Sequence, residues 1–550
     1  MLAEAFAGNV FHGVAPLPQG ALKKRGIIDA MKTGAFSLAF SLLLPAAAWA
    51  HGVHDGAAHW PHAVQVAQAA PAALPSLGDA GEMTPLQERK LGDRIAREMF
   101  RDPSFFDDPV LTQWVDGIWQ PLRAAARQRG DMPPELDEAY AWRVLLGREG
   151  EINAFAVPGG YFGLYLGMIG VVDSRDELAS VMAHEMAHVT QRHISRMTSR
   201  QARQAPLLLA SLILGALAAG SNPQAGAALI TGGQAAALQQ QLNYSRDMER
   251  EADRIGHGIY QQAGFSAQGM ASMFEKLQNA TRLSDRGDWP WLRSHPLTAE
   301  RIAEARLRAP REAGKASAEP DLAQAQIAAR ARVLSRPGVD KLRDWAKAPQ
   351  GTGERGLPLQ RRVASLYAAA LAQAELRHLG EAQALAAQLP ALVQSQPAAA
   401  RQARLLQADL ALRAKDYAQV KTLLQAHVPE GAEGRPEQLF LAQAETASGQ
   451  AQQAAERLQR WVSLHADDGT AWQLLAAAWR ERGQPLHALR AEGQAQLAWQ
   501  DLAGAAQRFR AAQDWVRQHP QADHIEAAIV DTRLRETQQA LKAQQEEEKE

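Results

Sequence analysis

The chain has 550 residues, more than one hydrophobic core normally serves, so two or more domains are expected. Its formal charge of −1, from 59 basic and 60 acidic residues, gives no indication of a nucleic-acid or polyacidic partner. The chain contains no cysteine, which excludes disulfides, thiolate metal sites, cysteine nucleophiles and a lipid-modified cysteine anchor.

The amino-terminal region has the pattern of a secretory signal. A charged segment at Met31 and Lys32 precedes a short apolar run that ends in Ala-Trp-Ala at residues 48–50. We therefore expect residues 1–50 to be a signal peptide, with Met31 as an alternative start. A retained membrane anchor is the alternative to cleavage.

Two features are expected between the signal and the central motif. Residues 51–84 are rich in Ala, Pro, Gly and His and lack helical periodicity, so they are predicted to be a flexible leader. A helix is predicted from Leu86 to Phe100, at the start of a first domain that we place at residues 85–310.

The segment from His184 to His188 reads His-Glu-Met-Ala-His, the HExxH pattern. On a helix the two histidines share one face and can bind one ion, while Glu185 beside them can accept a proton from water. This is the ligand-and-base arrangement of a zinc peptidase, and two ordinary core or solvated histidines are the alternative. The surrounding apolar residues recur at three- and four-residue steps, as in an amphipathic helix; they are Leu178, Val181, Met182, Met186 and Val189.

A catalytic zinc needs a third protein ligand. The three-histidine pattern HExxHxxGxxH is excluded, because Gln191 and Ile194 occupy its glycine and final histidine positions. His193 falls one residue short of that final position and is expected to cap or to pack.

Residues 205–240 form an apolar insertion after this helix. Their nearly all-apolar stretch at residues 206–220 is too short to cross a bilayer as a helix. A buried core helix, a membrane-touching hairpin and a lid over the cleft are the three interpretations. We favour helices packed beside the active site, with membrane contact as the alternative.

A later charged segment offers the missing ligand. Glu249 and Asp253 are four residues apart and share a helical face, so one can bind the metal while the other holds a histidine in place. The spacing does not choose between Glu249 and Glu251, and a solvated charged face is the alternative.

From residue 320 to about 540 the composition shifts to Ala, Leu, Gln and Arg, which predicts an α-helical domain. Turn-like positions at Gly380, Lys415, Gly449 and Gly483 recur at nearly the tetratricopeptide period. Such repeats stack into a solenoid whose concave face binds peptides or folded partners, and a helical array without a binding role is the alternative.

Together, the ordered motifs resemble the membrane-linked metallopeptidase family that includes the CAAX prenyl endopeptidases and their bacterial relatives. The resemblance is carried by HExxH, by Glu249 to Asp253, by the stretch 153–167 and by the His295-Pro296 pair. In that family the ligand glutamate stands three residues before the alanine of an Ala-Asp pair, which implies Glu249. The implied fold is mainly α (α+β): an HExxH zinc metallopeptidase domain with a small β-sheet, followed by a tetratricopeptide-repeat solenoid.

The resemblance also implies roles for further residues. The stretch 153–167 is similar to the family's strand pair before the zinc helix, and a strand ending near residues 161–170 is expected to offer an edge to an extended peptide. His295 is implied either to stabilise the transition state or to occupy the fourth zinc position as a switch, and a role beside Pro296 without metal contact is the alternative. Asp253 and Arg301 are expected to support the site. The residues assigned to the substrate edge strand are Asn153, Phe155, Gly159, Gly160 and Tyr161.

Family members with C-terminal repeats provide the functional expectation. They imply one Zn²⁺ per chain and a periplasmic endopeptidase, with chaperone-like activity, that acts on unfolded or stalled outer-membrane proteins. The repeats are expected to dock on the β-barrel assembly machinery, with peripheral membrane contact and no nucleic acid. The alternative is a chaperone or adaptor whose protease site is largely autoinhibited.

Overall fold

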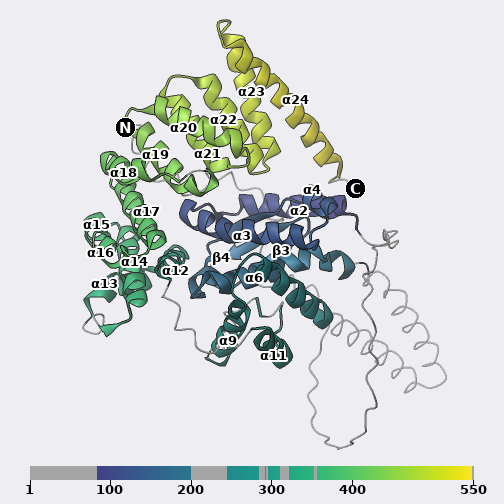
Figure 1. Cartoon of the computed structure of the whole chain (residues 1–550). Coiled ribbons are helices and arrows are strands. Elements are labelled where there is room, and N and C mark those ends of the chain that lie inside the picture. Colours follow the sequence, from purple (N-terminus) through teal and green to yellow (C-terminus); the bar gives the residue numbers. More distant parts are fainter. Residues whose placement is uncertain are drawn as a thin grey trace, which may run out of the picture.

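The computed structural model describes residues 83–197, 199, 245–283, 291–292, 295–309, 321–351, 356–429 and 431–547. The predicted signal peptide, nearly all of the leader and the 205–240 insertion lie outside the described residues. The remaining chain is mainly helical with one small sheet, as expected (Figure 1).

The sheet has four strands in the order β1-β2-β4-β3. The strands are β1 (Phe105–Phe106), β2 (Arg143–Gly147), β3 (Ala154–Val157) and β4 (Tyr161–Tyr165). β2 and β4 pair in parallel, whereas the β1–β2 and β3–β4 pairs are antiparallel. The β3–β4 hairpin turns at Gly159 and Gly160, whose φ angles of 74° and 80° favour glycine. A Cβ on Gly159 would also lie 2.7 Å from the Cα of Arg89.

Helices cover both faces of the sheet. The predicted amino-terminal helix is α2 (Pro85–Arg101), which begins with a capping box at Thr84 and packs Ile95 and Met99 on one face. α3 (Pro109–Arg129) and α6 (Arg175–Thr190) cover the other face. The first part also contains α4 (Pro134–Ala139), α5 (Leu166–Val171), a helix over 245–262, α9 (Gln268–Leu283) and α11 (Ala299–Arg308).

α6 carries the HExxH segment and begins where Ser174 caps the backbone N–H of Glu177. The helix is confirmed, but it is not amphipathic in the way the apolar spacing suggested. It contacts α3, α9 and β3, so nearly every side chain is buried, including those of His184 and Glu185. A helix enclosed on several sides needs small or apolar residues all around, and the predicted stripe is only part of that surface.

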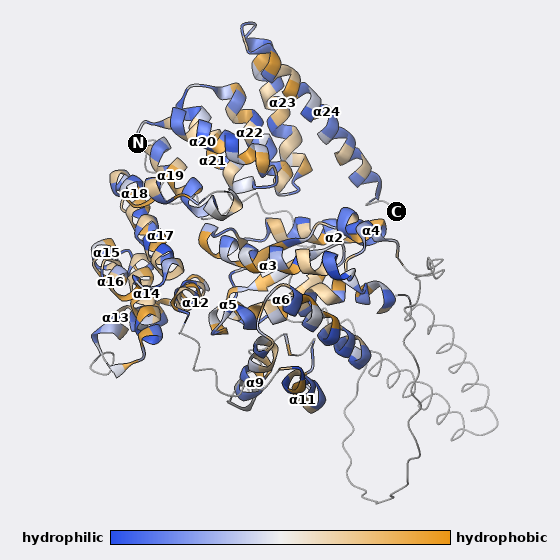
Figure 2. Ribbon diagram, in the orientation of Figure 1, coloured by the Kyte–Doolittle hydropathy of each residue, from blue (hydrophilic) through white to orange (hydrophobic). Residues whose placement is uncertain are grey.

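The rest of the chain forms antiparallel helical hairpins that curve from α12 beside α5 to α24 near α2 (Figure 1). α24 exposes a mostly hydrophilic surface (Figure 2). The helices are α12 (Leu322–Leu334), α13 (Val339–Lys347), η2 (Ala348–Gln350), α14 (Leu359–Glu375), α15 (Leu379–Ala386), α16 (Leu389–Val393), α17 (Pro397–Arg413), α18 (Tyr417–Leu424), η4 (Gln425–His427), η5 (Gly431–Gly434), α19 (Arg435–Ala447), α20 (Ala451–Leu464), α21 (Gly469–Glu481), α22 (Pro485–Ala498), α23 (Leu502–Gln518) and α24 (His524–Glu547).

Three of the four predicted turn positions lie at left-handed turns within hairpins, with φ of 61° at Lys415, 78° at Gly449 and 67° at Gly483. The prediction for Gly380 is wrong, because this residue lies inside α15. The corresponding left-handed residue is Arg377, with φ of 69°.

Two neighbouring aspartates before α3 attach the sheet domain to the hairpins. Asp108 caps α3 and accepts hydrogen bonds from Nε and Nη2 of Arg330, at 2.8 and 2.6 Å. Nη2 of Arg330 also donates to Asp409 of α17 at 2.9 Å. Arg435 of α19 similarly joins Asp107 to a second aspartate of the hairpins, Asp468. All three groups of the Arg330 cluster are buried, so each charge depends on its partners.

We predict that Arg330→Ala lowers the free energy of unfolding by about 3–5 kcal/mol, because buried Asp108 loses its guanidinium partner and buried Asp409 keeps only Arg413. Urea unfolding followed by circular dichroism measures the change. Arg343→Ala is the control, since Arg343 is exposed and should alter stability by no more than about 0.5 kcal/mol. A loss below about 1 kcal/mol for Arg330→Ala would contradict the assigned role.

Candidate metal centre

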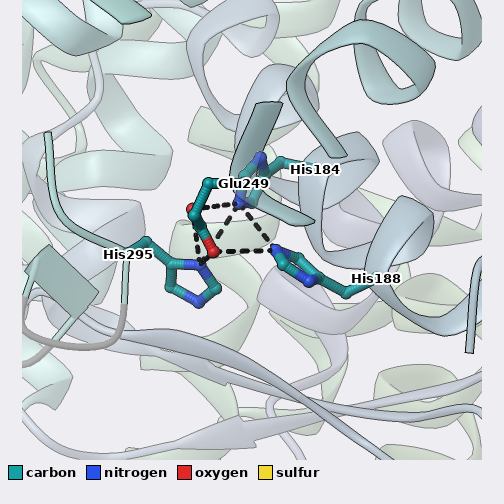
Figure 3. Close-up of side chains that lie close together, drawn as sticks. All are labelled: His184, His188, Glu249 and His295. Atoms are coloured by element: carbon teal, nitrogen blue, oxygen red, sulfur yellow. Dashed lines mark hydrogen bonds and ion pairs between the residues drawn. The ribbon is translucent and has the colours of Figure 1, made fainter. Parts of the chain in front are cut away.

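Three segments bring four donor side chains together: His184 and His188 come from α6, Glu249 from the helix over 245–262, and His295 from the loop before α11 (Figure 3). The two helices approach closely at Gly256. A Cβ there would lie 3.0 Å from the backbone of Ala183 and His184, which explains why the crossing point carries no side chain.

The four donors converge on one small volume. Nε2 of His184 lies 3.0 Å from Nε2 of His188 and 3.4 Å from Oε2 of Glu249. Nε2 of His188 lies 3.4 Å from Oε1 of Glu249. Nδ1 of His295 is 3.2 Å from Nε2 of His184 and 3.0 Å from Oε1 of Glu249.

This donor set fits a divalent metal such as zinc. Four ligands at zinc bond lengths of about 2.0–2.1 Å in a tetrahedron lie about 3.3 Å from one another. The measured separations cluster around that value, and all four donor atoms lie within 4.8 Å of one another. Imidazole nitrogens and one carboxylate oxygen are also the ligand types that zinc prefers.

A carboxylate–guanidinium pair holds His184. Its Nδ1 lies 2.9 Å from Oδ1 of Asp253, so its Nε2 is left to face the donor cluster. Arg301 donates to Asp253 from Nε at 2.6 Å and from Nη2 at 2.9 Å, and its Nη1 lies 3.0 Å from Glu249. Nη1 also donates to the carbonyl of Pro296 at 2.9 Å, so Arg301 ties the His295 loop to the same group.

His193 and Glu251 lie behind the other histidine of the pair. Nδ1 of His193 is 2.8 Å from Nδ1 of His188, and Nε2 of His193 is 3.1 Å from Glu251. Glu251 also accepts a hydrogen bond from Arg196 at 2.9 Å. Glu249 therefore faces the donor cluster while Glu251 does not, and His193 neither caps a helix nor serves only as packing.

The charges around the donors are unevenly distributed. Burial disfavours the protonated form of His184, but hydrogen bonds to Asp253 and Glu249 outweigh it and raise its pKa to about 9. Burial lowers the pKa of His188 to about 3 and that of His193 to about 4. Although burial opposes ionisation, hydrogen bonds from His184 and Arg301 lower the pKa of Asp253 to about 2. The buried carboxylates are thus ionised, and a cation at the position that a metal would occupy would stabilise them.

Glu185 lies on the other side of His295. Its Oε1 accepts a hydrogen bond from Nε1 of Trp291 at 2.8 Å and lies 3.4 Å from Nε2 of His295. The indole of Trp291 also stacks on the imidazole of His295, with centroids 5.1 Å apart. The predicted base and the predicted switch residue are therefore in contact with the same tryptophan.

The predicted substrate edge needs correction. β4, which starts at Tyr161, is an inner strand because β2 pairs with its other side, and the terminal strand is β3. Phe155 lies on β3, Asn153 directly precedes it, and Gly159 and Gly160 form the turn. The hydroxyl of Tyr161 donates to Asp93 and accepts from Gln500.

Sequence reasoning missed Trp291 and the contacts of His193 and Glu251. Trp291 lies outside every recognised motif, and its contact with Glu185 joins segments more than 100 residues apart. For His193 the missing information was a backbone turn at Arg192, whose φ is 54°.

Comparison with known proteins agrees with this geometry. A profile of peptidase family M48 matches residues 120–309. The putative beta-barrel assembly-enhancing protease of Vibrio cholerae is 34% identical over 337 residues, which are 60% of this chain and 66% of the relative. The beta-barrel assembly-enhancing protease of Escherichia coli (strain K12) is 33% identical over 455 residues, covering 79% of this chain and 87% of the relative. The corresponding protein of Yersinia pestis is 31% identical over 419 residues, with coverages of 74% and 81%.

The chain belongs to peptidase family M48. It is a metalloprotease, and the similarity to beta-barrel assembly-enhancing proteases extends well beyond the matched peptidase region. The converging histidines and glutamate are consistent with that activity. Among the described helices, none is long and apolar enough to cross a membrane.

We predict that zinc at a hundredfold excess over its Kd stabilises the native chain by about 2.7 kcal/mol, because it binds only the folded state. Glu249→Ala should abolish this stabilisation, as seen in thermal unfolding with and without zinc. Glu300→Ala is the control, since Glu300 is an exposed residue of α11 whose partner Arg250 lies on the helix that carries Glu249. Stabilisation of Glu249→Ala to the native extent would exclude Glu249 as a ligand.

Proposed function

We propose that this chain is a periplasmic zinc endopeptidase that degrades misassembled outer-membrane proteins and assists their assembly. The observation that carries the proposal is the convergence of His184, His188, Glu249 and His295 beside the buried carboxylate of Glu185. The similarity to beta-barrel assembly-enhancing proteases supports the choice of substrate class.

Each residue has a part in hydrolysis. His184, His188 and Glu249 would hold the zinc, which when bound supplies Lewis acidity that lowers the pKa of water toward about 7 and polarises a carbonyl. Glu185 accepts the proton of the attacking water and returns it to the leaving amine. The indole N–H of Trp291 orients the carboxylate of Glu185 for both transfers.

An extended peptide would bind along β3 as an added strand. β3 is the terminal strand of the sheet and contacts α6, so a peptide paired with it runs past the donor cluster. Such pairing uses backbone groups and gives loose sequence selectivity, which suits unfolded substrates.

His295 would close the site in the resting enzyme. Its Nδ1 lies among the other donors, at the distances that a fourth ligand would have. Its Nε2 points to Glu185, so one imidazole faces both the metal position and the base. This arrangement favours the occluding role over transition-state stabilisation, because a substrate carbonyl and water need the same space.

The helical hairpins would provide the partner surface as a tetratricopeptide solenoid. Their left-handed turns at Lys415, Gly449 and Gly483 recur every 34 residues, the period of that repeat. We propose that they dock on the β-barrel assembly machinery, with residues 1–50 directing export.

A second candidate is a chaperone or adaptor that cleaves only rarely. The position of His295 beside the other donors favours this candidate, since an active site closed by His295 would hydrolyse peptides slowly.

We predict that Glu185→Gln lowers kcat for an unfolded outer-membrane protein by about 10²–10⁴-fold, because the general base is lost. Zinc content, measured by atomic emission, should stay at that of the native chain. Asp247→Asn, an exposed change near Glu249, is the control. If Glu185→Gln cells assemble outer-membrane barrels normally, the protease account fails and the chaperone account stands.

His295→Ala should raise the rate of hydrolysis by at least about tenfold, which corresponds to removing about 1.4 kcal/mol of closure. Initial rates on the same substrate measure the change, with the exposed His378→Ala as control. A fall in rate would show that His295 stabilises the transition state.

A further inference from the structure

One ligand histidine depends on residues to which the proposed mechanism gives no role. His188 contacts His193 through the two Nδ1 atoms at 2.8 Å, and His193 contacts Oε2 of Glu251 at 3.1 Å. Nη1 of Arg196 donates to the same oxygen at 2.9 Å. A row of four side chains thus leads from a metal ligand to a guanidinium.

The hydrogens of this row have one consistent arrangement. His188 presents Nε2 to the donor cluster, so as a neutral ligand it carries its hydrogen on Nδ1 and donates to His193. His193 accepts at Nδ1 and therefore carries its own hydrogen on Nε2. That hydrogen points to Glu251, whose carboxylate only accepts. Each group thereby fixes the tautomer of the next.

Backbone geometry builds this contact. α6 ends at Thr190, and the left-handed residue Arg192 interrupts the helical path before a short helix over 193–197. His193 is folded back against His188 and is only 3% exposed. Glu251 reaches it from the helix that also carries Glu249.

We propose that His193 is a positioning residue which, together with Glu251, fixes the tautomer and ring orientation of His188 for metal binding. It does for His188 what Asp253 does for His184, with one imidazole inserted between the ligand and the carboxylate. This inference rests on the proposed metal site.

Zinc affinity of the full chain, measured by competition with a chromophoric chelator, tests the proposal. His193→Ala should weaken binding about 10–100-fold, the usual effect of removing a group that orients a metal ligand. His193→Gln should recover most of the loss, because its amide oxygen can accept the hydrogen of His188 Nδ1. His257→Ala, a histidine change on the neighbouring helix outside the donor cluster, should leave affinity unchanged.

Thermal unfolding in the presence of chelator separates positioning from simple packing. We expect His193→Ala and His193→Gln to unfold at similar temperatures once zinc is removed, so that a difference between their zinc affinities reports positioning. Native zinc affinity in His193→Ala overturns the proposal. The proposal is also overturned if His193→Ala and His193→Gln lose equal zinc affinity and both unfold below the native temperature in chelator. His188→Ala tests the metal site separately from the role of His193. Native zinc affinity in that variant would show that His188 is not a ligand and would overturn the proposed metal site.

Discussion

The bidentate salt bridge between Arg301 and Asp253 is the interaction on which the metal centre depends. Asp253 is almost fully buried, and an unpaired carboxylate there would carry a large desolvation cost. The guanidinium removes that cost and also reaches Glu249 and the carbonyl of Pro296. The proposed ligand Glu249, the group that orients His184, and the loop bearing His295 are consequently held by one side chain.

The same dependence on buried charge links the peptidase to the hairpins. Asp107 and Asp108 precede α3, which packs against α6, and each is paired with an arginine from the hairpins. Tyr161, at the start of the strand next to β3, contacts Gln500 from the hairpins. A continuous hydrophobic core also crosses from α3 and α6 to α17 and α19. The proposed partner surface on the hairpins and the proposed peptide edge on β3 therefore belong to one connected body.

Local patterns predicted much of this molecule. The helix around His184 and His188 followed from the spacing of its residues, and the facing of Glu249 and Asp253 followed from helical periodicity. The period near 34 residues predicted paired helices, although the turn at Arg377 shows that a left-handed position need not be glycine.

What failed depended on long-range or backbone information. The edge strand was misassigned because nothing in Tyr161 or its neighbours shows that β2 pairs with β4. A continuous helix would leave His193 one residue short of the third-histidine position, and the break at Arg192 accompanies its contact with His188. Trp291 reaches Glu185 across a large sequence separation, which periodicity does not register.

We propose above that His295 completes a four-ligand site in the resting enzyme. Anomalous diffraction at the zinc edge from crystals of the zinc-loaded chain tests it most directly. We expect one peak about 2.0–2.1 Å from nitrogens of His184, His188 and His295 and about 2.0–2.2 Å from an oxygen of Glu249. A peak bound by the other three ligands and a water, with His295 beyond bonding distance, would contradict it.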